Sequence, residues 1–411
     1  MIDDNHWRIR APGRGKYGFP AGGNRPGREA DMSYDVIVAG GGPAGSGLAV
    51  FLAGAGMKVL LLEKSRYPRF KPCGGALSPR VAELLDFPWR EIVRDTAGRV
   101  DCHLGPGRRV SVEYGEPVAY LVERDDLDSL LARRAAALGA EVREDSPVTG
   151  VELAAEGVTV ATGTGKYRGG LLACADGVHS LAARRTGLYG SRRLGVTLAA
   201  ELVPKDPERF RGRMVIDLGA CRGGYGWIFP KGDRLSVGLG SFGRVADLRS
   251  LLSAFLAGHG LGDHTVARQR GHLIPADGNL KRIVARGRVF LLGDAAALVD
   301  PFTGEGIYYA VLSARLAARA ILAGDGEAAA SYQQLVDGQI RRNLATAGRI
   351  ARLFYALPAP FFALVERHPE LAESVIRAAY GATGYASLAW GRAGFRRIWR
   401  KAFGHPVSRE P

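Results

Sequence analysis

The sequence predicts an α/β protein with three parts: a parallel sheet covered by helices, a separate antiparallel sheet, and a helical C-terminal region. Three observations predict this fold class. Residues 34–63 read as strand, glycine turn, helix and strand. Alternating strand patterns recur between residues 190 and 280, and a second strand–turn–helix pattern covers residues 288–322. A chain of 411 residues is long enough for two or three domains and an ample core.

The first of these segments carries a glycine pattern. Asp35–Ala39 is a short apolar run that suits a buried parallel strand, and Gly40, Gly42 and Gly45 follow it as G-x-G-x-x-G. The first glycine permits a tight turn, the second lets the backbone approach a pyrophosphate, and the third lets the helix pack close to the strand. The helix N-terminus offers free N–H groups to the phosphates. The segment therefore predicts dinucleotide binding in a Rossmann-type domain; a glycine-rich turn in an unrelated α/β protein is the alternative.

An acidic residue ends the second strand of this unit. Val59–Leu62 is apolar, and Glu63 follows it, 18 residues after Gly45. A carboxylate at this place can accept hydrogen bonds from ribose hydroxyls and would repel a 2′-phosphate. Glu63 thus completes the dinucleotide-binding pattern.

The remaining elements follow from periodicity and turn residues. We expect a helix over residues 125–138 and strands over 140–143 and 157–162. Residues 213–217 and 235–240 alternate in the way typical of an antiparallel sheet. Later elements return to the pattern of the first domain, with a strand over 288–292, a helix over 307–322, and mainly helical sequence over 331–411.

Composition and charge limit the class of protein. The chain has a net charge of +15, which favours anionic partners, but it contains no nucleic-acid-binding motif. No apolar run is long enough for a membrane-spanning helix, and no cleavable signal is evident. The four cysteines lie far apart and predict neither a metal site nor a disulfide framework, so a cytoplasmic setting is expected.

The C-terminal segment is both basic and aromatic. Residues 341–411 contain 12 arginines and lysines against four glutamates, together with several aromatic side chains that include Trp390, Phe395, Trp399 and Phe403. A basic, aromatic helical segment suits peripheral contact with a membrane surface, or a lipid-like ligand. A solvated arginine-rich face over an ordinary helical core is the alternative.

Two further segments contain motifs of their own. Ala173–Ser180 is similar to the internal Asp-Gly motif of glutathione-reductase-type flavoproteins, and Val289–Ala296 with Asp300–Ile307 resembles the second flavin motif of the p-hydroxybenzoate-hydroxylase-like class. The resemblance implies that the carboxylate of Asp294 contacts the ribityl chain. It also implies a helix whose N-terminus faces the flavin pyrimidine, where its partial positive charge would stabilise negative charge on reduced flavin.

Three shorter segments narrow the resemblance to the geranylgeranyl reductase family. Lys71–Ser78 resembles its Lys-x-Cys-Gly-Gly loop, and Gly224–Lys231 resembles the Tyr-x-Trp-x-Phe-Pro strand that lines its prenyl site. Arg124–Asp128 resembles its Arg-x-x-(aromatic)-Asp helix start, although Leu127 stands where an aromatic residue is common. The resemblance covers about residues 33–320.

The resemblance implies a set of residues that bind FAD: Gly40, Gly42, Ala44, Gly45, Glu63, Cys73, Gly74, Ala76, Arg124, Val148, Asp176, Asp294, Pro301, Gly304, Gly306 and Ile307. Asp176 is expected to act structurally, in the turn under the pyrophosphate. Arg124 could instead only pair with Asp128 at i, i+4 spacing, and Asp294 could only cap the helix that follows it.

Composition and the order of elements divide the chain. Residues 1–32 are rich in Gly, Pro and Arg and lack periodicity, so we expect a disordered extension or, alternatively, a start codon placed too early, with Met32 as the natural start. Residues 331–411 are expected to be helical. The FAD-binding domain is expected in segments 33–100 and 281–330, with a mixed segment 101–190 that returns to it, and the antiparallel substrate domain over 191–280.

The activity that the resemblance implies is reduction of carbon–carbon double bonds in a geranylgeranyl or other isoprenoid chain, carried by a lipid, diphosphate, chlorophyll-type or quinone-type substrate. Cys73, Tyr225 and Trp227 are the candidate catalytic residues. Cys73 could position the substrate or relay a proton, or be an inert thiol, and the aromatic residues could equally form an apolar sheet core. Lys71, Arg69 and Arg66 could meet a phosphate or a headgroup.

No second G-x-G-x-x-G pattern with its discriminating residue occurs, so we expect electrons from docked NAD(P)H or from a carrier protein of the ferredoxin type. Two other functions use the same scaffold. One is an FAD-dependent monooxygenase of an aromatic or polyketide-like substrate, and the other is a membrane-associated electron-transfer flavoprotein that feeds quinones. The Cys-Gly-Gly loop and the Tyr-Gly-Trp strand favour the reductase over the monooxygenase. Only the basic C-terminal segment supports the electron-transfer flavoprotein, and no set of cysteines could hold an iron–sulfur cluster.

Overall fold

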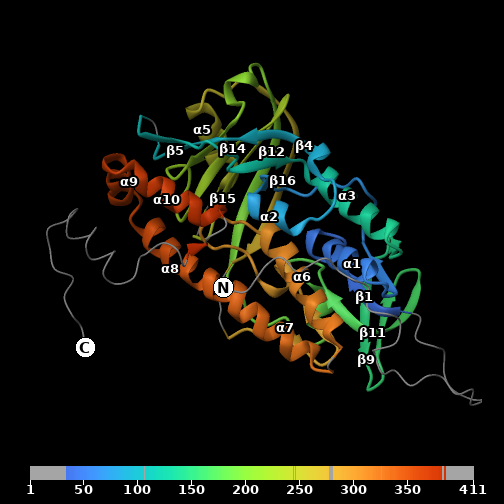
Figure 1. Cartoon of the computed structure of the whole chain (residues 1–411). Coiled ribbons are helices and arrows are strands. Elements are labelled where there is room, and N and C mark those ends of the chain that lie inside the picture. Colours follow the sequence, from blue (N-terminus) through green and yellow to red (C-terminus); the bar gives the residue numbers. More distant parts are fainter. Residues whose placement is uncertain are drawn as a thin grey trace, which may run out of the picture.

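The computed structural model describes residues 34–385, apart from 106, 244, 246, 277–280, 325, 382 and 383. The expected N-terminal extension, with Met32, lies outside the described residues, as do residues 386–411 with four of the aromatic side chains noted above. Figure 1 shows two sheet regions, with the last helices running along one side of both.

The larger sheet has eight strands, and most of its pairs are parallel. Its main path runs β17-β18-β11-β1-β2-β8, and a β9–β10 hairpin pairs with β11. β1 lies between two parallel neighbours and is almost completely buried, because helices cover both faces. Its strands are β1 (Tyr34–Ala39), β2 (Val59–Leu62), β8 (Glu141–Arg143), β9 (Val148–Leu153), β10 (Val158–Thr162), β11 (Gly165–Cys174), β17 (Ala285–Arg286) and β18 (Val289–Leu291).

The helices of this region surround the glycine-turn helix. α1 packs between α3 and α6, which is why nearly every residue of α1 is buried. The helices predicted over 125–138 and 307–322 are both confirmed, with ends that differ by one residue. The helices are α1 (Pro43–Gly54), α2 (Pro79–Leu84), α3 (Arg124–Ala137), α4 (Leu181–Arg185), α6 (Ile307–Ala323) and α7 (Ala328–Val336).

The second sheet has seven strands in the order β16-β12-β15-β14-β13-β5-β6. It is antiparallel except for the β13–β5 pair, which is parallel. Two of its strands, β5 and β6, precede residue 191, so the sheet draws on more of the chain than 191–280. The strands are β5 (Arg99–His103), β6 (Arg109–Glu113), β12 (Leu194–Pro204), β13 (Arg213–Asp217), β14 (Gly224–Lys231), β15 (Arg234–Ser241) and β16 (His264–Pro275); α5 (Leu248–Gly258) packs on it.

A small sheet joins the two larger ones. It has the order β3-β7-β4, with β3 (Ala76–Leu77), β4 (Val93–Ala97) and β7 (Ala119–Val122). β4 and β7 both contact β14, so the loop that precedes β3 lies between the two sheet regions. This placement puts residues 71–75 beside the second sheet.

Three C-terminal helices complete the described chain: α8 (Arg342–Ala356), α9 (Pro358–Arg367) and α10 (Pro369–Tyr380). They run along the side of the molecule, and α9 and α10 reach β6 at the far edge of the second sheet (Figure 1). Across the described ranges no single helix is long and apolar enough to cross a membrane; Ala328–Ala356 and Pro358–Arg367 meet that test only as a pair, and the pair is bent by 99°.

Candidate functional site

The glycine turn between β1 and α1 has the geometry that a phosphate-binding turn requires. Gly40 has a φ of +100°, and a Cβ atom there would lie 2.5 Å from the carbonyl oxygen of Ala175. A Cβ on Gly45 would lie 1.9 Å from the carbonyl oxygen of Gly40, so only glycine lets α1 pack this closely on β1. A Cβ on Gly42 would meet only Arg69, at 3.9 Å, and Ala44 lies in the first turn of the helix.

The N-terminus of α1 therefore faces open space. Its first turn holds no acidic residue that would oppose an anion. Free N–H groups, the positive end of the helix dipole and a glycine at the N-cap together form a cradle that a pyrophosphate fits.

Glu63 closes the turn from the end of β2. Its Oε2 atom accepts a hydrogen bond of 2.8 Å from the Gly41 amide, and its Oε1 atom accepts one of 3.1 Å from the Ser65 amide. The carboxylate is almost completely buried, and the guanidinium group of Arg69 also approaches both of its oxygens, at 3.4 Å from Oε1 and 3.5 Å from Oε2. Val148 lies close by at the start of β9, because the Ser146 amide donates to the carbonyl oxygen of Glu63.

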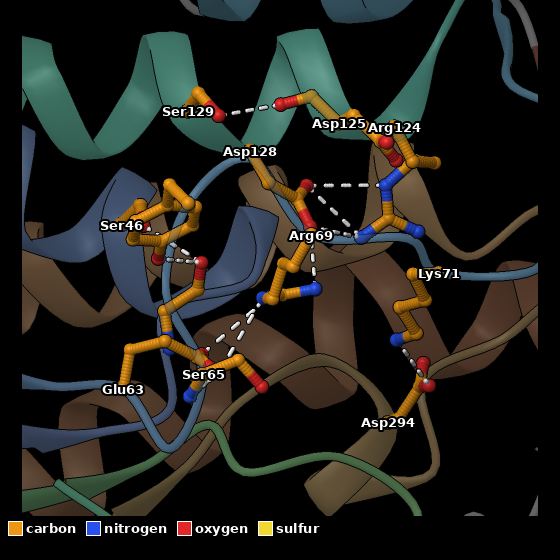
Figure 2. Close-up of polar contacts among 12 residues, drawn as sticks. Ser46, Glu63, Ser65, Arg69, Lys71, Arg124, Asp125, Asp128, Ser129 and Asp294 are labelled. Atoms are coloured by element: carbon orange, nitrogen blue, oxygen red, sulfur yellow. Dashed lines mark hydrogen bonds and ion pairs between the residues drawn. The ribbon is translucent and has the colours of Figure 1, made fainter. Parts of the chain in front are cut away.

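A buried ion-pair network continues from Glu63 into the interior (Figure 2). Arg69 lies 3.4 Å from Glu63 and 3.0 Å from Asp128, and Asp128 also accepts hydrogen bonds of 2.9 to 3.1 Å from Arg124. The expected Arg124–Asp128 pair is present, and the same Arg124 lines the central cavity. The two carboxylates balance the two guanidinium groups, so the network is buried without a net charge.

The second half of the site is built around η4 (Gly293–Ala296) and the start of α6. Asp294 lies in η4, and its carboxylate is 3.8 Å from the ammonium group of Lys71 (Figure 2). Gly306 is the N-cap of α6, Ile307 is the first residue of that helix, and its first turn contains no acidic residue. The Asp300 carboxylate accepts hydrogen bonds from two amides of the connecting loop and so fixes the turn before Gly304.

The loop that carries Cys73 is held by contacts from the second sheet. The Gly75 amide donates to the Cys73 thiol at 3.3 Å, and the hydroxyl of Ser236 donates to the Cys73 carbonyl at 3.2 Å. Lys231, which is 3% exposed, donates from its ammonium group to the Gly75 carbonyl at 3.1 Å. A Cβ on Gly74 would lie 2.7 Å from the ring of Phe229, so glycine is needed where the loop meets β14.

A cavity of about 160 Å³ lies between these parts. It brings together ten of the predicted residues: Cys73, Gly74, Ala76, Arg124, Tyr225, Trp227, Asp294, Gly304, Gly306 and Ile307. The glycine turn residues, Glu63 and Val148 lie outside its lining, on the side of the first domain, and Pro301 lines a different cavity. Such an elongated arrangement suits an extended dinucleotide, with one end at the glycine turn and the other in the cavity.

Asp176 has a local structural task. Its carboxylate accepts hydrogen bonds from the Ser180 hydroxyl and, at 3.0 Å, from the Ala182 amide, so it caps the start of α4. Burial raises the pKa of this carboxyl above its usual value. The structural role expected for Asp176 agrees with these contacts.

Two aromatic residues of β14 face the cavity, as alternation along a strand requires. The hydroxyl of Tyr225 donates to the carbonyl oxygen of Thr303, and burial raises its pKa, so it stays protonated. The indole of Trp227 donates to the Ser236 hydroxyl at 3.4 Å and is 7% exposed. Both rings therefore belong to the apolar sheet core and to the cavity wall at once.

Two ionisable residues of the cavity were missed by the sequence reasoning. The pKa of His272 is lowered to about 4, mainly by burial and next by the charge of Lys71. The Nε2 atom of His272 is buried without a hydrogen-bond partner among the described residues. Glu305 is buried against Ser78 and Arg80, at 2.6 Å from each, and burial raises its pKa. His272 comes from β16, where no local motif marks it, whereas Glu305 stands inside the Gly-x-Gly segment already noted.

A second cavity, of about 100 Å³, adjoins the first and is almost wholly apolar. Tyr225, Thr303 and Tyr380 line both cavities. Its other lining residues come from β5, from β13 and the turn after it, from the loop before α6, and from the C-terminal helices: Val100, Cys102, Met214, Ile216, Leu218, Phe302, Phe354, Tyr355, Phe361, Phe362, Val365, Ala372, Val375, Ile376 and Ala379. We refer to it as the apolar chamber.

The cations that were proposed to meet a phosphate have partners within the chain. Lys71 lies near Asp294, Arg69 pairs with Glu63 and Asp128, and exposed Arg66 pairs with Asp145. Their positive charge is therefore already balanced, and no other anion is needed to explain their positions.

The comparisons agree with this geometry. Residues 33–209 match the family model described as an FAD binding domain. The chain is 33% identical over 318 residues to a geranylgeranyl diphosphate reductase of Rhodobacter capsulatus, covering 71% of this chain and 76% of that protein. It is 33% identical over 363 residues to a menaquinone reductase of Mycobacterium tuberculosis, covering 79% of this chain and 84% of that protein.

A solved structure shares the whole fold. The structure of a geranylgeranyl bacteriochlorophyll reductase-like protein of Thermoplasma acidophilum aligns with a TM-score of 0.74 at 24% identity, and covers 90% of this chain and 97% of that one. The glycine cradle, Glu63, and the unpartnered His272 nitrogen in the cavity are all features that FAD fits.

Proposed function

The chain belongs to the geranylgeranyl reductase family of FAD-dependent oxidoreductases, and from this premise we propose that it saturates carbon–carbon double bonds of a geranylgeranyl or related isoprenoid chain. The observation that carries the proposal is the apolar chamber, which shares wall residues with the cavity where the Cys73 loop, Asp294 and the N-terminus of α6 meet. An isoprenoid tail is long, flexible and apolar, and this chamber offers it a water-free wall.

FAD, when bound and reduced, supplies the hydride for one alkene carbon. The residues proposed to hold it are the predicted set: the glycine turn, Glu63 and Val148 on one side, and Cys73, Gly74, Ala76, Arg124, Asp294, Gly304, Gly306 and Ile307 in the central cavity. Asp176 supports the turn before α4, and Pro301 belongs to the predicted set as a residue of the loop before α6. The positive end of α6 and the neutral ring of His272 would meet the flavin's polar edge.

The other alkene carbon needs a proton. Cys73 lies in the central cavity with its thiol held by the Gly75 amide, and we propose that it delivers or relays this proton. An isolated alkene is a poor hydride acceptor, so the two transfers must be aligned in a dry site. Tyr225 and Trp227 are proposed to hold the alkene in that alignment.

The electron donor is a separate part of the proposal. We propose that NAD(P)H docks transiently or that a carrier protein of the ferredoxin type delivers the electrons, because the chain has one dinucleotide-binding pattern. Peripheral contact with a membrane through residues 341–411 would bring the protein to a lipid-borne substrate. Vesicle co-sedimentation of the intact protein tests this contact, and a Trp390→Ser/Trp399→Ser variant should bind anionic vesicles more weakly.

The experiment for the activity is product analysis. Dithionite-reduced protein is incubated with geranylgeranyl diphosphate without oxygen, and the lipid is examined by mass spectrometry. A mass gain of H₂ per reduced double bond is expected. Unchanged lipid, across phosphorylated and unphosphorylated geranylgeranyl compounds, would contradict the proposed function.

A further inference from the structure

A third cavity, open and about 570 Å³ in volume, lies beside the first two and has a basic rim. Four of its lining residues are cationic: Arg193, Lys281, Arg349 and Arg352. Among the residues that the structure describes, no aspartate or glutamate lines it, and all four cationic residues are exposed. We refer to it as the basic cavity. Its apolar wall is formed in part by Phe242, Pro301 and Tyr355.

Three of these cationic residues, Arg193, Arg349 and Arg352, have no ion pair with an acidic residue of the described chain, unlike the arginines of the Arg69 network. Arg349 and Arg352 lie on α8, and no carboxylate of the described residues comes within 4.0 Å of either. Arg193 donates to the carbonyl oxygen of Phe242 at 3.1 Å, which leaves its charge without an acidic partner. Several guanidinium groups around one open cavity form a site for a multivalent anion such as a phosphate or diphosphate.

The basic cavity shares walls with both interior cavities. Phe242 lines the basic cavity and the central one, and Tyr355 lines the basic cavity and the apolar chamber. An amphiphile with an anionic head at the rim could therefore pass its tail inward along these two rings. Such a tail would reach the cavity that contains Cys73 without leaving the protein.

We propose that the basic cavity binds the phosphate or diphosphate headgroup of the isoprenoid substrate, through Arg349 and Arg352 with Arg193 and Lys281 at the rim. This inference rests on the proposed function, since it assigns a headgroup class to the same substrate. Among the headgroups that the family allows, it selects phosphorylated ones over quinones. Prenyl monophosphate, diphosphate and phospholipid share the chemistry that the site recognises.

The test compares two double variants with the same change of charge. Arg349→Gln/Arg352→Gln removes both cations of α8 from the basic cavity, while Arg133→Gln/Arg342→Gln removes two exposed arginines that line none of the three cavities. Binding to the oxidised, FAD-loaded proteins is measured by equilibrium dialysis for the free probes and by co-sedimentation for the vesicle probe. The probes are geranylgeranyl diphosphate, geranylgeraniol, and digeranylgeranylglycerol phosphate in phosphatidylcholine vesicles. Flavin content and melting temperature confirm that both variants are folded.

We expect the first variant to bind geranylgeranyl diphosphate roughly ten- to hundredfold more weakly than the wild type and to bind geranylgeraniol with unchanged affinity. The control variant should bind every probe as the wild type does. If the first variant loses affinity for geranylgeranyl diphosphate alone, the natural ligand is a free prenyl diphosphate. If it loses affinity for the vesicle probe alone, the natural ligand is a lipid with a phosphate headgroup. Equal weakening of geranylgeraniol, or equal weakening by the control variant, would overturn the inference. Binding is measured without turnover, so intact headgroup-dependent binding with no lipid reduction would contradict the proposed function alone.

Discussion

The ammonium group of Lys231, at the end of β14, donates to the carbonyl oxygen of Gly75, two residues after Cys73. The same group donates to the Val122 carbonyl at 2.7 Å, and so joins the Cys73 loop, the small sheet and the second sheet at one buried point. Burial lowers the pKa of Lys231 to about 8 from 10.5, partly opposed by Glu123. A buried cation thus positions the loop that is proposed to carry the proton donor.

The depressed pKa of Lys231 makes stability depend on pH in a defined direction. Between pH 8 and 10.5 the unfolded chain holds the Lys231 proton and the folded protein releases it, so the unfolding free energy rises with pH across this window. The rise should be roughly 3 kcal/mol and absent from Lys231→Met. Denaturant unfolding of both proteins across the window measures it; exposed Lys205→Met controls for removal of a lysine. Parallel pH profiles of Lys231→Met and wild type would contradict this prediction.

Asp128→Asn should be strongly destabilising, because Asp128 is fully buried and joins Arg69 to Arg124. Breaking a buried pair leaves uncompensated charge and costs about 3–5 kcal/mol. Asp126, on the same helix, pairs with Arg94 at a half-exposed site, so Asp126→Asn should cost less than about 1 kcal/mol. Urea unfolding measures the unfolding free energy of both variants. Equal decreases in the two variants would show that the network is not buried as described.

Glu63→Arg and Asp294→Ala should each lower FAD retention. Glu63→Arg places a cation beside the Gly41 amide and removes an acceptor from the turn, and Asp294→Ala removes the carboxylate beside Lys71. The ratio of visible to ultraviolet absorbance after gel filtration measures retained flavin. Glu144→Arg makes the same charge change at an exposed site just after β8 and should retain full flavin. If the Glu63 and Asp294 variants both retain a full complement of flavin, neither residue belongs to the cofactor site.

The locally encoded half of the site could be predicted from the sequence. The strand, turn and helix over 34–54 lie next to one another in the chain, and the space around Gly40 and Gly45 follows from that short segment. The Cys73 loop and the aromatic side chains of β14 were also identified, and they do meet in one cavity.

The long-range half could not be predicted in this way. His272 reaches the cavity from an edge strand whose local pattern is exposed and polar. Lys231 has the sequence position of a polar residue at the end of a strand, and only the folded structure brings it to the carbonyl oxygen of Gly75. The parallel pairing of β5 with β13 joins segments more than 100 residues apart, which no local periodicity encodes.

Cys73→Ala should lower kcat at least tenfold with KM and flavin content little changed, if the thiol delivers the proton. Cys73→Ser keeps a hydroxyl at the same place and should retain part of the rate, with a shifted pH profile. Cys221 lines none of the three cavities, so Cys221→Ser tests for a general effect of thiol loss. A Cys73→Ala variant with an unchanged kcat and pH profile would leave the thiol a structural role only.

Val375→Phe should shorten the isoprenoid that the protein accepts. Val375 lines the apolar chamber from α10, and a larger side chain would fill part of its roughly 100 Å³. We expect kcat/KM to fall about tenfold or more for geranylgeranyl diphosphate and to change little for geranyl diphosphate. Ser374→Phe, one residue earlier and exposed, is the matched control. Equal effects on both substrates would place the tail elsewhere.

The most direct test of the central claim follows the flavin and the lipid together. The protein is photoreduced without oxygen, mixed with geranylgeranyl diphosphate, and followed through the visible flavin band while the lipid is sampled for mass spectrometry. The account predicts that the flavin reoxidises at the rate at which the dihydro product appears, with one double bond reduced for each flavin oxidised. Reduced flavin that persists with the lipid and reoxidises only when oxygen enters, with the mass of the lipid unchanged, would contradict it and favour a monooxygenase.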